Sequence, residues 1–528
     1  MKFGAVSALA GLLFSTATFA APTWDRSPQN IERLRKEMKA EAANRHQETV
    51  VAHLVNPVAA APVTHTQKHT KFYNSKTKEF WVNGTAGAIP DVNFDVPESF
   101  AGLMPISADK NETRKLYFWF FPTLGGKDTE DDLVIWLNGG PGCSSLEGLM
   151  QENGPFTWKA GTYLPVKNKY TWANLSNIVW VEQPVGTGFS QGEPNILNEQ
   201  DMAAQFLGFF KNFVDKFGLH RKRIWITGES YAGVYIPYIA DAMYNKKDTR
   251  NFNLKGTLIY DPSIASDLIS EEVPAVPFML RNQAIFNLPD EIAANLTTWH
   301  EKCGYADIYK QGLTFPPAGK INVTGAVKSR DCRLWSKVWS AANRINPCFN
   351  VYHITDTCPS PWDVMGMSDD FGDQPKGAKT YFTRPEVQKA INAPIMPDWS
   401  ECSEKDVFPH GDKSVYPAPG GILSRVIEKS ERTIVAHGLH DYILLAEGTL
   451  MALNNMTWHG AQGFSERPSS KFVVPYDGQG DMGVWREERG LTYIEIKASG
   501  HMVPGYQPGA AFRHLEYLLG KVKDMSVI

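Results

Sequence analysis

The sequence has almost no excess charge of either sign, and this absence excludes one broad class of function. Its 53 Lys and Arg residues face 57 Asp and Glu residues, which gives a formal net charge of -4. Proteins that bind nucleic acid concentrate positive charge to neutralise phosphates, and no such excess is present. Hydrophobic residues make up 43% and charged residues 21% of the 528, as in an ordinary globular protein. We therefore expect a folded chain that binds no nucleic acid.

Long apolar runs are also missing after the N-terminus. None approaches the roughly 20 residues that a membrane-spanning helix needs, and the C-terminal sequence lacks the hydrophobic tail of a lipid-anchor signal. We expect no stable membrane anchor. Residues 1–20 combine Lys2, a short apolar stretch and a small-residue site at Ala20, which is typical of a cleaved secretory signal peptide. A membrane anchor is the alternative, but this stretch is too short to span.

Cysteine is scarce, and no closely spaced group of His, Cys and Asp suggests metal ligands. An even number of cysteines on a secretory route is typical of disulfides. The six cysteines are Cys143, Cys303, Cys332, Cys348, Cys358 and Cys402. Six cysteines allow 15 pairings, and the residues alone do not choose among them. We expect disulfide bonds, no metal and no cofactor.

Six Asn-x-Ser/Thr sequons accompany the signal peptide and favour a secreted glycoprotein, with a vacuole-like compartment as the alternative destination. They lie at Asn83, Asn111, Asn174, Asn295, Asn322 and Asn455. Residues 21–70 contain a charged amphipathic stretch, 27–47, followed by a linker rich in Ala, Pro and Thr. This pattern predicts a removable pro-segment, although a helix that stays docked on the surface would look the same.

Strand-like runs alternate with helical stretches after residue 71. The runs are continuously apolar rather than alternating, which is typical of strands buried on both faces of a parallel sheet. The clearest occupy residues 132–138, 177–182, 223–227, 432–437 and 493–498, and residues 202–217 have helical periodicity. The rhythm predicts a mostly parallel α/β sheet with helices on both faces. Its two parts would be residues 71–266 and 381–528.

The strand rhythm lapses between these two parts, in residues 267–380. Four of the six cysteines and two of the six sequons lie in this stretch. We interpret it as an insertion, or cap subdomain, over the C-terminal edge of the sheet and held together by disulfides.

A candidate nucleophile stands between a predicted strand and a predicted helix. Residues 228–233 read Gly-Glu-Ser-Tyr-Ala-Gly, a G-x-S-x-G sequence in the strand, turn and helix context that gives it meaning. Glycines at both ends allow a tight turn, which would expose Ser230 at a helix N-terminus. A purely structural turn is the alternative.

A serine nucleophile needs a base and a carboxylate that orients the base. Asp441 follows the predicted strand 432–437, and His501 follows the predicted strand 493–498. Both therefore leave the same sheet edge as Ser230, in the order Ser, Asp, His. His437 and His440 flank Asp441 and are rival bases, although taken alone they would cap turns or lie on the surface.

A glycine-rich loop follows the first predicted strand, in the sequence WLNGGPGCSS at residues 136–145. Free backbone N–H groups beside a nucleophile can form an oxyanion hole. The chain continues through Glu152, which we expect to reach the same space as Glu229, the residue before the nucleophile.

Four motifs together resemble the serine carboxypeptidase family. WLNGGPGCSS, ENGPF, GESYAG and GHMVP occur in the family's order and spacing, and the resemblance covers about residues 73 to 520. The stretches DPSIASD and NPCFNVYHITDTCP further resemble the fungal carboxypeptidase S1-like branch. The resemblance implies an α/β-hydrolase fold and an exopeptidase that releases C-terminal amino acids from peptides and proteins through an acyl-enzyme.

Position by position, the resemblance implies a role for each motif residue. Ser230 would be the nucleophile, His501 the general base and acid, and Asp441 its orienting carboxylate. The oxyanion hole would use the N–H groups of Gly140 and Tyr231. The substrate's C-terminal carboxylate would be held by Asn138, Gly139, Glu152 and Glu229, and the pocket for its C-terminal side chain (S1′) would include Glu147 and Met502. Cys143 would pair with Cys402.

No Arg or Lys lies in these motifs to neutralise the substrate carboxylate. Two glutamates face it instead, so at least one must be protonated to donate a hydrogen bond. We expect peptide binding to weaken as pH rises, giving an acid optimum. Glu147 would favour a terminal Lys or Arg, unless it is a solvated helix residue.

Two other functions remain as alternatives. One is esterase or acyltransferase chemistry on the same triad, and the other is a non-catalytic binding glycoprotein. The carboxylate-binding set argues against the first, because an ester without a carboxylate does not need it. The intact triad argues against the second. The sequence does not indicate the oligomeric state.

Overall fold

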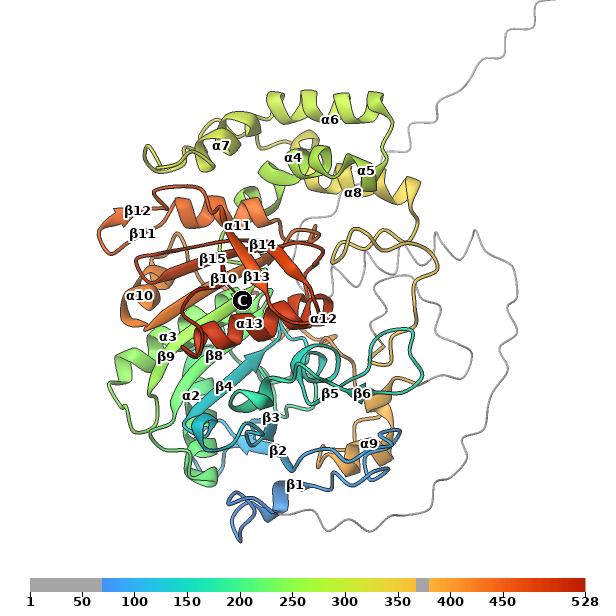
Figure 1. Ribbon diagram of the computed structural model, residues 1–528, viewed down its shortest axis with the longest axis vertical. Coiled ribbons are helices and arrows are strands. Elements are labelled where there is room, and N and C mark those ends of the chain that lie inside the picture. The colour runs from blue at the N-terminus through green and yellow to red at the C-terminus, as the bar shows by residue number, and fades with distance from the viewer. Residues whose placement is uncertain (1–68, 367–378, 528) are drawn as a thin grey trace, which may run out of the picture.

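The computed structural model describes residues 69–366 and 379–527, and a single large sheet runs through them (Figure 1). Its strand order is β1-β2-β3-β7-β4-β8-β9-β10-β15-β14-β13. The six central strands, β7 to β15 in this order, run parallel. Antiparallel strands extend the sheet at both margins.

The strands of this sheet are β1 (Trp81–Val82), β2 (Ser99–Pro105), β3 (Lys115–Phe121), β4 (Asp132–Leu137), β7 (Asn177–Glu182), β8 (Arg223–Glu229), β9 (Leu254–Tyr260), β10 (Arg432–Gly438), β13 (Ser470–Val474), β14 (Gly480–Glu488) and β15 (Leu491–Ile496). Two small hairpins join β5 (Phe156–Thr157) to β6 (Val166–Lys167) and β11 (Thr457–Trp458) to β12 (Ala461–Gln462). All five predicted strands are confirmed, and the last lies two residues earlier than predicted.

Both faces of the central strands are buried, which explains their unbroken apolar sequences. Along β4, Leu133 and Ile135 pack in one hydrophobic cluster, while Val134 and Trp136 pack in another. This alternation follows from the two-residue repeat of a strand. The sequence pattern therefore identified buried strands correctly.

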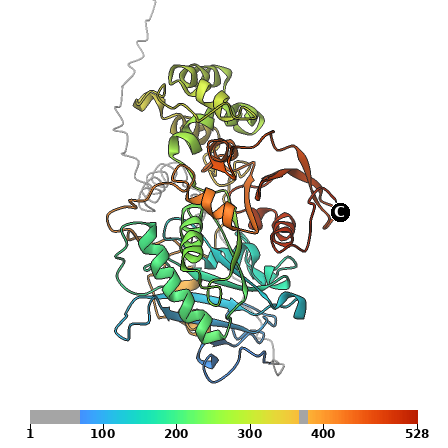
Figure 2. The same cartoon turned by 90° about the vertical axis from the view of Figure 1, so that its left-hand side faces the viewer.

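Helices cover each face of the sheet (Figure 2). The helices α2 (Glu199–Phe217) and α3 (Ala232–Lys246) supply the cluster on one face, and α13 (Pro508–Leu518) packs in the cluster on the other. The helix expected at residues 202–217 is α2. The remaining helices of the two core parts are α9 (Pro385–Ala390), α10 (Ile422–Lys429), α11 (Ala446–Asn454) and α12 (Val503–Tyr506).

Residues 268–345 form a separate group of helices beyond α11 (Figure 1). They are η5 (Leu268–Glu272), α4 (Val273–Arg281), α5 (Gln283–Phe286), α6 (Asp290–Lys302), α7 (Tyr305–Gly312), η6 (Arg330–Cys332) and α8 (Leu334–Ile345). Between residues 267 and 380, the described part of the chain contains no strand. Disulfides join Cys303 to Cys332 and Cys348 to Cys358, the pairings that the sequence left open. The boundaries of this cap subdomain stay a prediction.

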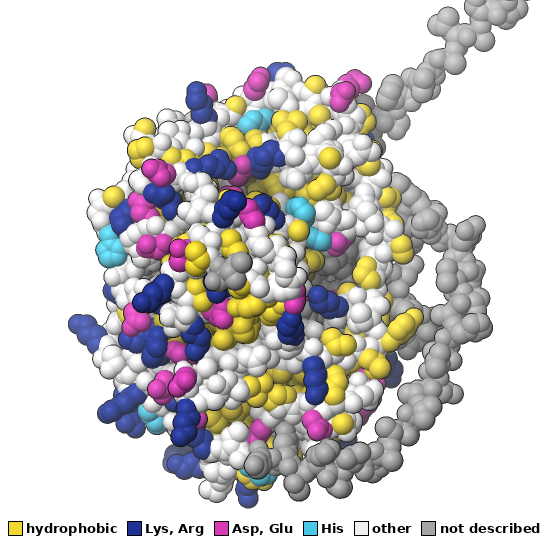
Figure 3. Space-filling model, in the orientation of Figure 1, with side chains coloured by type: hydrophobic (Ala, Val, Ile, Leu, Met, Phe, Trp, Pro, Cys, Tyr) yellow, Lys and Arg dark blue, Asp and Glu magenta, His cyan; other side chains and the backbone are white. Residues whose placement is uncertain are grey.

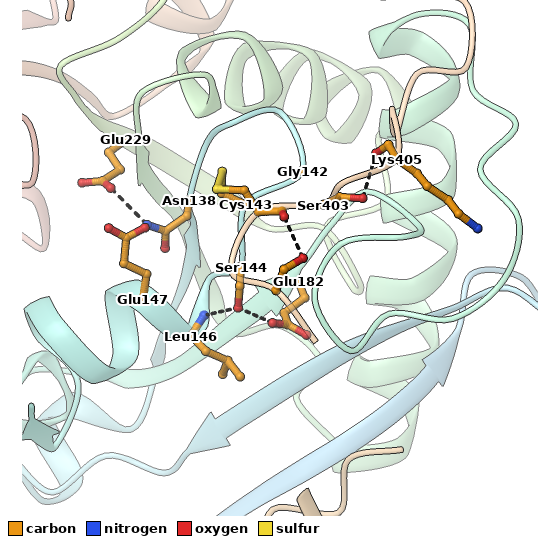
Figure 4. The surroundings of a disulfide bond; sticks show 12 residues. Asn138, Gly142, Cys143, Ser144, Leu146, Glu147, Glu182, Glu229, Ser403 and Lys405 are labelled. Atoms are coloured by element: carbon orange, nitrogen blue, oxygen red, sulfur yellow. Dashed lines mark hydrogen bonds between the residues drawn. A yellow bond between two sulfur atoms is a disulfide. The ribbon is translucent and has the colours of Figure 1, made fainter. Parts of the chain in front are cut away.

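The third disulfide joins two distant parts of the chain beside the glycine-rich loop (Figure 4). Cys143 is bonded to Cys402, 259 residues away, as the family resemblance implied. Backbone hydrogen bonds flank the bond: the Ser144 N–H donates to Glu401 (2.7 Å), and the Ser403 N–H donates to Gly142 (2.9 Å). The loop after β4 is therefore fixed by the segment around residue 402.

The predicted signal peptide, residues 1–20, and nearly all of the predicted pro-segment, residues 21–70, lie outside the described residues. The sequons Asn83, Asn111, Asn295 and Asn322 are exposed, whereas Asn174 and Asn455 are half-buried. Among the described residues, no helix is both long and apolar enough to cross a bilayer. Acidic and basic side chains are interspersed on the face shown in Figure 3.

Glu182, at the end of β7, is a fully buried carboxyl group without a basic partner in its hydrogen bonds. It accepts hydrogen bonds from the Ser144 hydroxyl and the Phe189 N–H. Burial raises its pKa to about 8, although these two hydrogen bonds act in the opposite direction. An ordinary glutamate in the unfolded chain titrates near 4.3, so the folded protein binds the proton more strongly between about pH 4 and 8.

Replacement of this carboxyl group by an amide tests its effect on stability. Because the folded state holds the extra proton, the contribution of Glu182 falls by about 1.4 kcal/mol per pH unit as pH rises from about 4 to 8. In Glu182→Gln this fall is absent, so its melting temperature relative to wild type should increase from pH 5 to pH 8. Thermal unfolding at both pH values measures this change. Glu193→Gln, at an exposed position, should show no such trend, and a constant offset for Glu182→Gln would contradict the prediction.

Candidate active site

Ser230 occupies the sharp turn between β8 and α3. Its φ of 61° lies in the left-handed region that side chains rarely adopt. Its N–H donates to the Tyr260 carbonyl (3.0 Å), and its carbonyl accepts from the N–H of Gly233 (2.8 Å). The glycines on either side are required by close packing: a Cβ at Gly228 would lie 2.1 Å from the Leu137 carbonyl oxygen. The strained turn leaves the Ser230 side chain half-exposed at the start of a helix.

Asp441 and His501 form a buried hydrogen-bonded pair. The His501 Nδ1 lies 2.7 Å from Asp441 Oδ2, and both residues are almost fully buried. Asp441 Oδ1 accepts hydrogen bonds from the backbone N–H groups of Ile443 (2.9 Å) and Leu444 (3.2 Å). Burial pushes the pKa of Asp441 upward, but the neighbouring His501 and His437 outweigh it and the pKa is lowered. The carboxylate is therefore ionised and orients the imidazole.

The second ring nitrogen of His501 carries no hydrogen bond in this structure. Its Nε2 atom is buried and has no partner among the described residues, so the hydrogen bond to Ser230 is not formed. Hydrogen bonds of this kind commonly close only when substrate binds. The strand ends place both residues at one edge of the sheet, because β8 and β15 run parallel within the central six strands.

The glycine-rich loop lies directly against the nucleophile turn. A Cβ at Gly139 would lie 2.5 Å from the Tyr231 nitrogen and 2.7 Å from the Ser230 Cβ. Gly140 has a φ of 110°, which only glycine adopts readily. The loop therefore brings its backbone directly against the Ser230 turn.

Three glutamates converge on Asn138, at the end of β4. The Asn138 amide donates to Glu229 Oε1 (3.0 Å) and to Glu147 Oε2 (3.1 Å), as Figure 4 shows. Its own oxygen accepts from the Trp136 indole (2.7 Å), which fixes the orientation of the amide. Glu152, in η3 (Gly148–Asn153), completes the group. Asn138 is thus held with its donor facing carboxyl groups.

Glu152 and Glu229 are buried and lack basic partners. Neither side-chain oxygen of Glu152 has a hydrogen-bond partner among the described residues, and Oε2 of Glu229 has none either. Burial raises the pKa of Glu152 to about 8. Burial and then the neighbouring Glu152 and Glu147 raise the pKa of Glu229 well above its usual range. Both carboxyl groups are therefore protonated in acid, with hydrogens to donate.

Glu147 belongs to the group around Asn138, and Met502 is the residue after the candidate base. Glu147 is half-buried and directly precedes η3, and Met502 follows His501 and precedes α12. Glu147 is therefore not a freely solvated helix residue, because the Asn138 amide donates to it.

Sequence reasoning missed two polar residues in this region and misjudged the position of a third. Glu182 gave no signal beyond its place at the end of a strand. Asp261 follows β9, and its side chain accepts from the Gly438 N–H (2.8 Å). His437 was expected to cap a turn or lie on the surface if it was not the base, but it is fully buried within 3.5 Å of Asp441. The prediction of a surface position was wrong, because β10 is a central strand with both faces covered.

The candidate nucleophile, acid and base all follow parallel strands, in the chain order Ser, Asp, His. This is the arrangement of the α/β-hydrolase fold. The sheet, the strained serine turn and the buried imidazole together define a serine hydrolase of that class.

Comparison with known proteins narrows this class. The model of the serine carboxypeptidase family matches residues 90–521, so the chain belongs to the serine carboxypeptidase family and is a serine-type exopeptidase. It is 48% identical over 487 residues to a probable serine carboxypeptidase of Arthroderma benhamiae, covering 89% of this chain and 91% of that protein. It is 44% identical over 479 residues to the serine-type carboxypeptidase F of Aspergillus niger, covering 85% and 88%.

A solved structure shares the fold. The crystal structure of Kex1, a prohormone-processing carboxypeptidase from Saccharomyces cerevisiae, superposes with a TM-score of 0.66 at 23% identity. The match covers 85% of this chain and 98% of that one. The substrates of the family are peptides with a free C-terminus.

Labelling with an organophosphorus reagent tests Ser230. We expect one label per wild-type chain with complete loss of activity, because the reagent reacts with an activated serine. Ser230→Ala should take up no label and lose more than about 10⁴-fold in kcat. Ser340→Ala, at an exposed position on α8, should behave as wild type. Labelling of Ser230→Ala would show that another residue is the nucleophile.

Proposed function

We propose that this serine carboxypeptidase removes residues from peptide C-termini in acid, with Ser230 as nucleophile, His501 as general base and acid, and Asp441 as the orienting carboxylate. The observation that carries the proposal is the pair of buried, cation-free carboxyl groups, Glu152 and Glu229, beside the serine turn. A general esterase has no use for such a pair. A peptide's terminal carboxylate can accept the hydrogens that both groups hold in acid.

The reaction passes through an acyl-enzyme. Ser230 Oγ attacks the carbonyl carbon of the last peptide bond while His501 Nε2 takes the hydroxyl proton. The N–H groups of Gly140 and Tyr231 stabilise the oxyanion. His501 then gives its proton to the departing amino acid, and the C–N bond breaks. Water, deprotonated by His501, releases the shortened peptide and restores Ser230.

The carboxylate-binding set works only while it is protonated. The Asn138 side chain donates an N–H to the terminal carboxylate of the substrate, and the backbone N–H of Gly139 is a further donor to the same carboxylate. Protonated Glu152 and Glu229 add two O–H donors, so no Arg or Lys is needed. Ionisation of either glutamate would place a negative charge against the substrate's own carboxylate. Peptide affinity is therefore highest in acid and is lost as pH rises through the pKa of the pair.

The pH dependence of KM tests this carboxylate-binding set. Because the pKa of Glu152 is about 8, the KM for an N-blocked peptide should rise by about tenfold per pH unit above that value. The KM for the same peptide with an amidated C-terminus should change much less. Steady-state kinetics from pH 4 to 9 measure both.

Two amide variants complete this experiment. In Glu152→Gln the donor no longer titrates, so the rise of KM at high pH should be weaker than in wild type. Glu193→Gln, exposed and distant, should follow wild type. A peptide KM that stays flat over the whole range would rule out the protonated pair.

We further propose that Glu147 and Met502 line the S1′ pocket and that Glu147 favours a terminal Lys or Arg. Glu147 is half-buried and lies beside Asn138. A half-buried carboxylate attracts a cationic side chain more strongly than an exposed one, because water screens it less.

Glu147→Gln tests this preference. The ratio of kcat/KM for peptides ending in Arg to those ending in Leu should fall by about tenfold, since the neutral amide keeps the shape but not the charge. Competition between the two peptides at pH 5 measures the ratio directly. The variant Glu404→Gln, at an exposed position, provides the control. An unchanged ratio for Glu147→Gln would remove Glu147 from the specificity pocket.

We also propose that the enzyme is secreted, with a vacuole-like compartment as the alternative. The signal-like residues 1–20, the three disulfides and the four exposed sequons support an oxidising, glycosylating route. Removal of residues 21–70 as a pro-segment would fit the same route.

A further inference from the structure

A second buried acid and a buried histidine lie beneath Asp441, and the mechanism above uses neither. Asp261 directly follows β9, and His437 lies in β10. Both are fully buried. One polar atom each of Asp261, His437 and Asp441 lie within 4.8 Å of one another. Two acids this close in a dry interior cannot both ionise at low cost.

The hydrogen-bond donors are distributed unequally between the two acids. Both carboxylate oxygens of Asp441 accept hydrogen bonds: Oδ1 accepts from two backbone N–H groups, and Oδ2 accepts from His501. Asp261 Oδ1 accepts from the Gly438 N–H (2.8 Å), while its Oδ2 has no partner among the described residues. Burial and then the nearby Asp441 raise the pKa of Asp261 well above its usual range. The negative charge therefore resides on Asp441, and Asp261 keeps its proton.

His437 links the two acids to a backbone carbonyl. Its Nε2 lies 2.8 Å from the Leu444 carbonyl oxygen, which can only accept, so Nε2 carries a hydrogen. The same atom is 3.3 Å from Asp261 Oδ1 and 3.5 Å from Asp441 Oδ2. A nitrogen that donates a hydrogen bond cannot at the same time bind a metal ion. The group is therefore a hydrogen-bonded support.

The two residues hold both ends of the segment that carries Asp441. Asp261 binds Gly438 at its start, and His437 binds Leu444 at its end. Gly438 is also packed against the loop of the base: a Cβ there would lie 2.2 Å from the carbonyl oxygen of Gly500, the residue before His501. A shift of Gly438 would therefore move both partners of the Asp441–His501 hydrogen bond.

We propose that Asp261 and His437 are positioning residues of the triad, which fix segment 438–444 and so hold Asp441 against His501 Nδ1 without adding a second negative charge. The proposal rests on the proposed roles of Ser230, Asp441 and His501.

Other acids act on this pair from neighbouring elements. Glu152 of η3 and Glu229 of β8 interact electrostatically with Asp261. Glu495 of β15 is paired in register with His437 and also has a raised pKa through burial. An ester substrate without a free carboxylate does not need Glu152 and Glu229 for binding, so their ionisation does not change its affinity. The pH profile of kcat for such an ester therefore reports on the triad.

The decisive variant is Asp261→Asn, because an amide reproduces both the acceptor and the hydrogen of a protonated acid. We expect it to retain more than about a third of the wild-type ester kcat, with the midpoint of the acid limb moved by less than about 0.3 pH unit. Asp261→Ala removes the acceptor for Gly438, and its kcat should fall by at least about tenfold with little change in KM. His437→Leu should show the same split.

Two outcomes would overturn the proposal. If the acid limb of Asp261→Asn moved down by about one pH unit or more, Asp261 would carry a charge in the working enzyme, since loss of a nearby negative charge lets an imidazole release its proton at lower pH. If Asp261→Asn lost as much kcat as Asp261→Ala, the amide would not substitute for a protonated acid. Asp261→Asn decides the matter even where Asp261→Ala fails to fold.

Labelling with the organophosphorus reagent separates this inference from the proposed function. Counting labelled sites normalises each kcat to competent enzyme, and thermal unfolding reports any loss of folded protein. Wild type that takes up no label at Ser230 would refute the proposed triad itself. Wild type that is labelled and active, with an Asp261→Asn profile that shifts, would refute only the role of Asp261. Asp128→Asn, at an exposed position, provides a matched control with wild-type kinetics.

Discussion

Carboxyl groups buried without a matching cation are the constraint on which the centre of this protein depends. Glu152, Glu182, Glu229 and Asp261 are all buried, and burial is the first cause that raises the pKa of each. Glu182, Glu229 and Asp261 accept hydrogen bonds from hydroxyl, amide or backbone groups, and Glu152 has no partner among the described residues. In the absence of a cation, the protein holds such acids in their neutral form. Asp441 is the exception, because two backbone N–H groups and an imidazole support its charge. At low pH the centre of the folded protein therefore holds these four acids without charge.

Five of the six central strands of the sheet could be predicted from the sequence, because strands buried on both faces leave an unbroken apolar signature. β4, β7, β8, β10 and β15 carry that signature, and all five were found. β14 could not be identified in the same way, because it is an antiparallel strand near the edge of the sheet whose exposed and half-buried residues dilute the pattern. The pairing of Cys303, Cys332, Cys348 and Cys358 was equally out of reach, since it depends on how loops meet in space.

The site residues, too, fall into some that the sequence could indicate and others that it could not. Ser230, Asp441 and His501 could be identified because each follows a recognisable strand, and parallel strands bring their ends to one edge. Asp261 also follows a strand, but β9 was not among the strands identified, so nothing marked its end. His437 lies inside a strand, where a histidine gives no sign of what its ring contacts. The hydrogen bond between His501 Nε2 and Ser230 is a further point that strand positions alone cannot decide, because it depends on the orientation of the two side chains.

The glycine-rich loop is completed by a part of the chain made much later. Gly140 lies only two residues before Gly142, which is joined by a backbone hydrogen bond to Ser403, and Cys143 is bonded to Cys402. The loop after β4 is therefore synthesised 259 residues before the cysteine to which it is bonded. The contacts that fix this loop therefore form only after the last third of the chain has folded back onto the first.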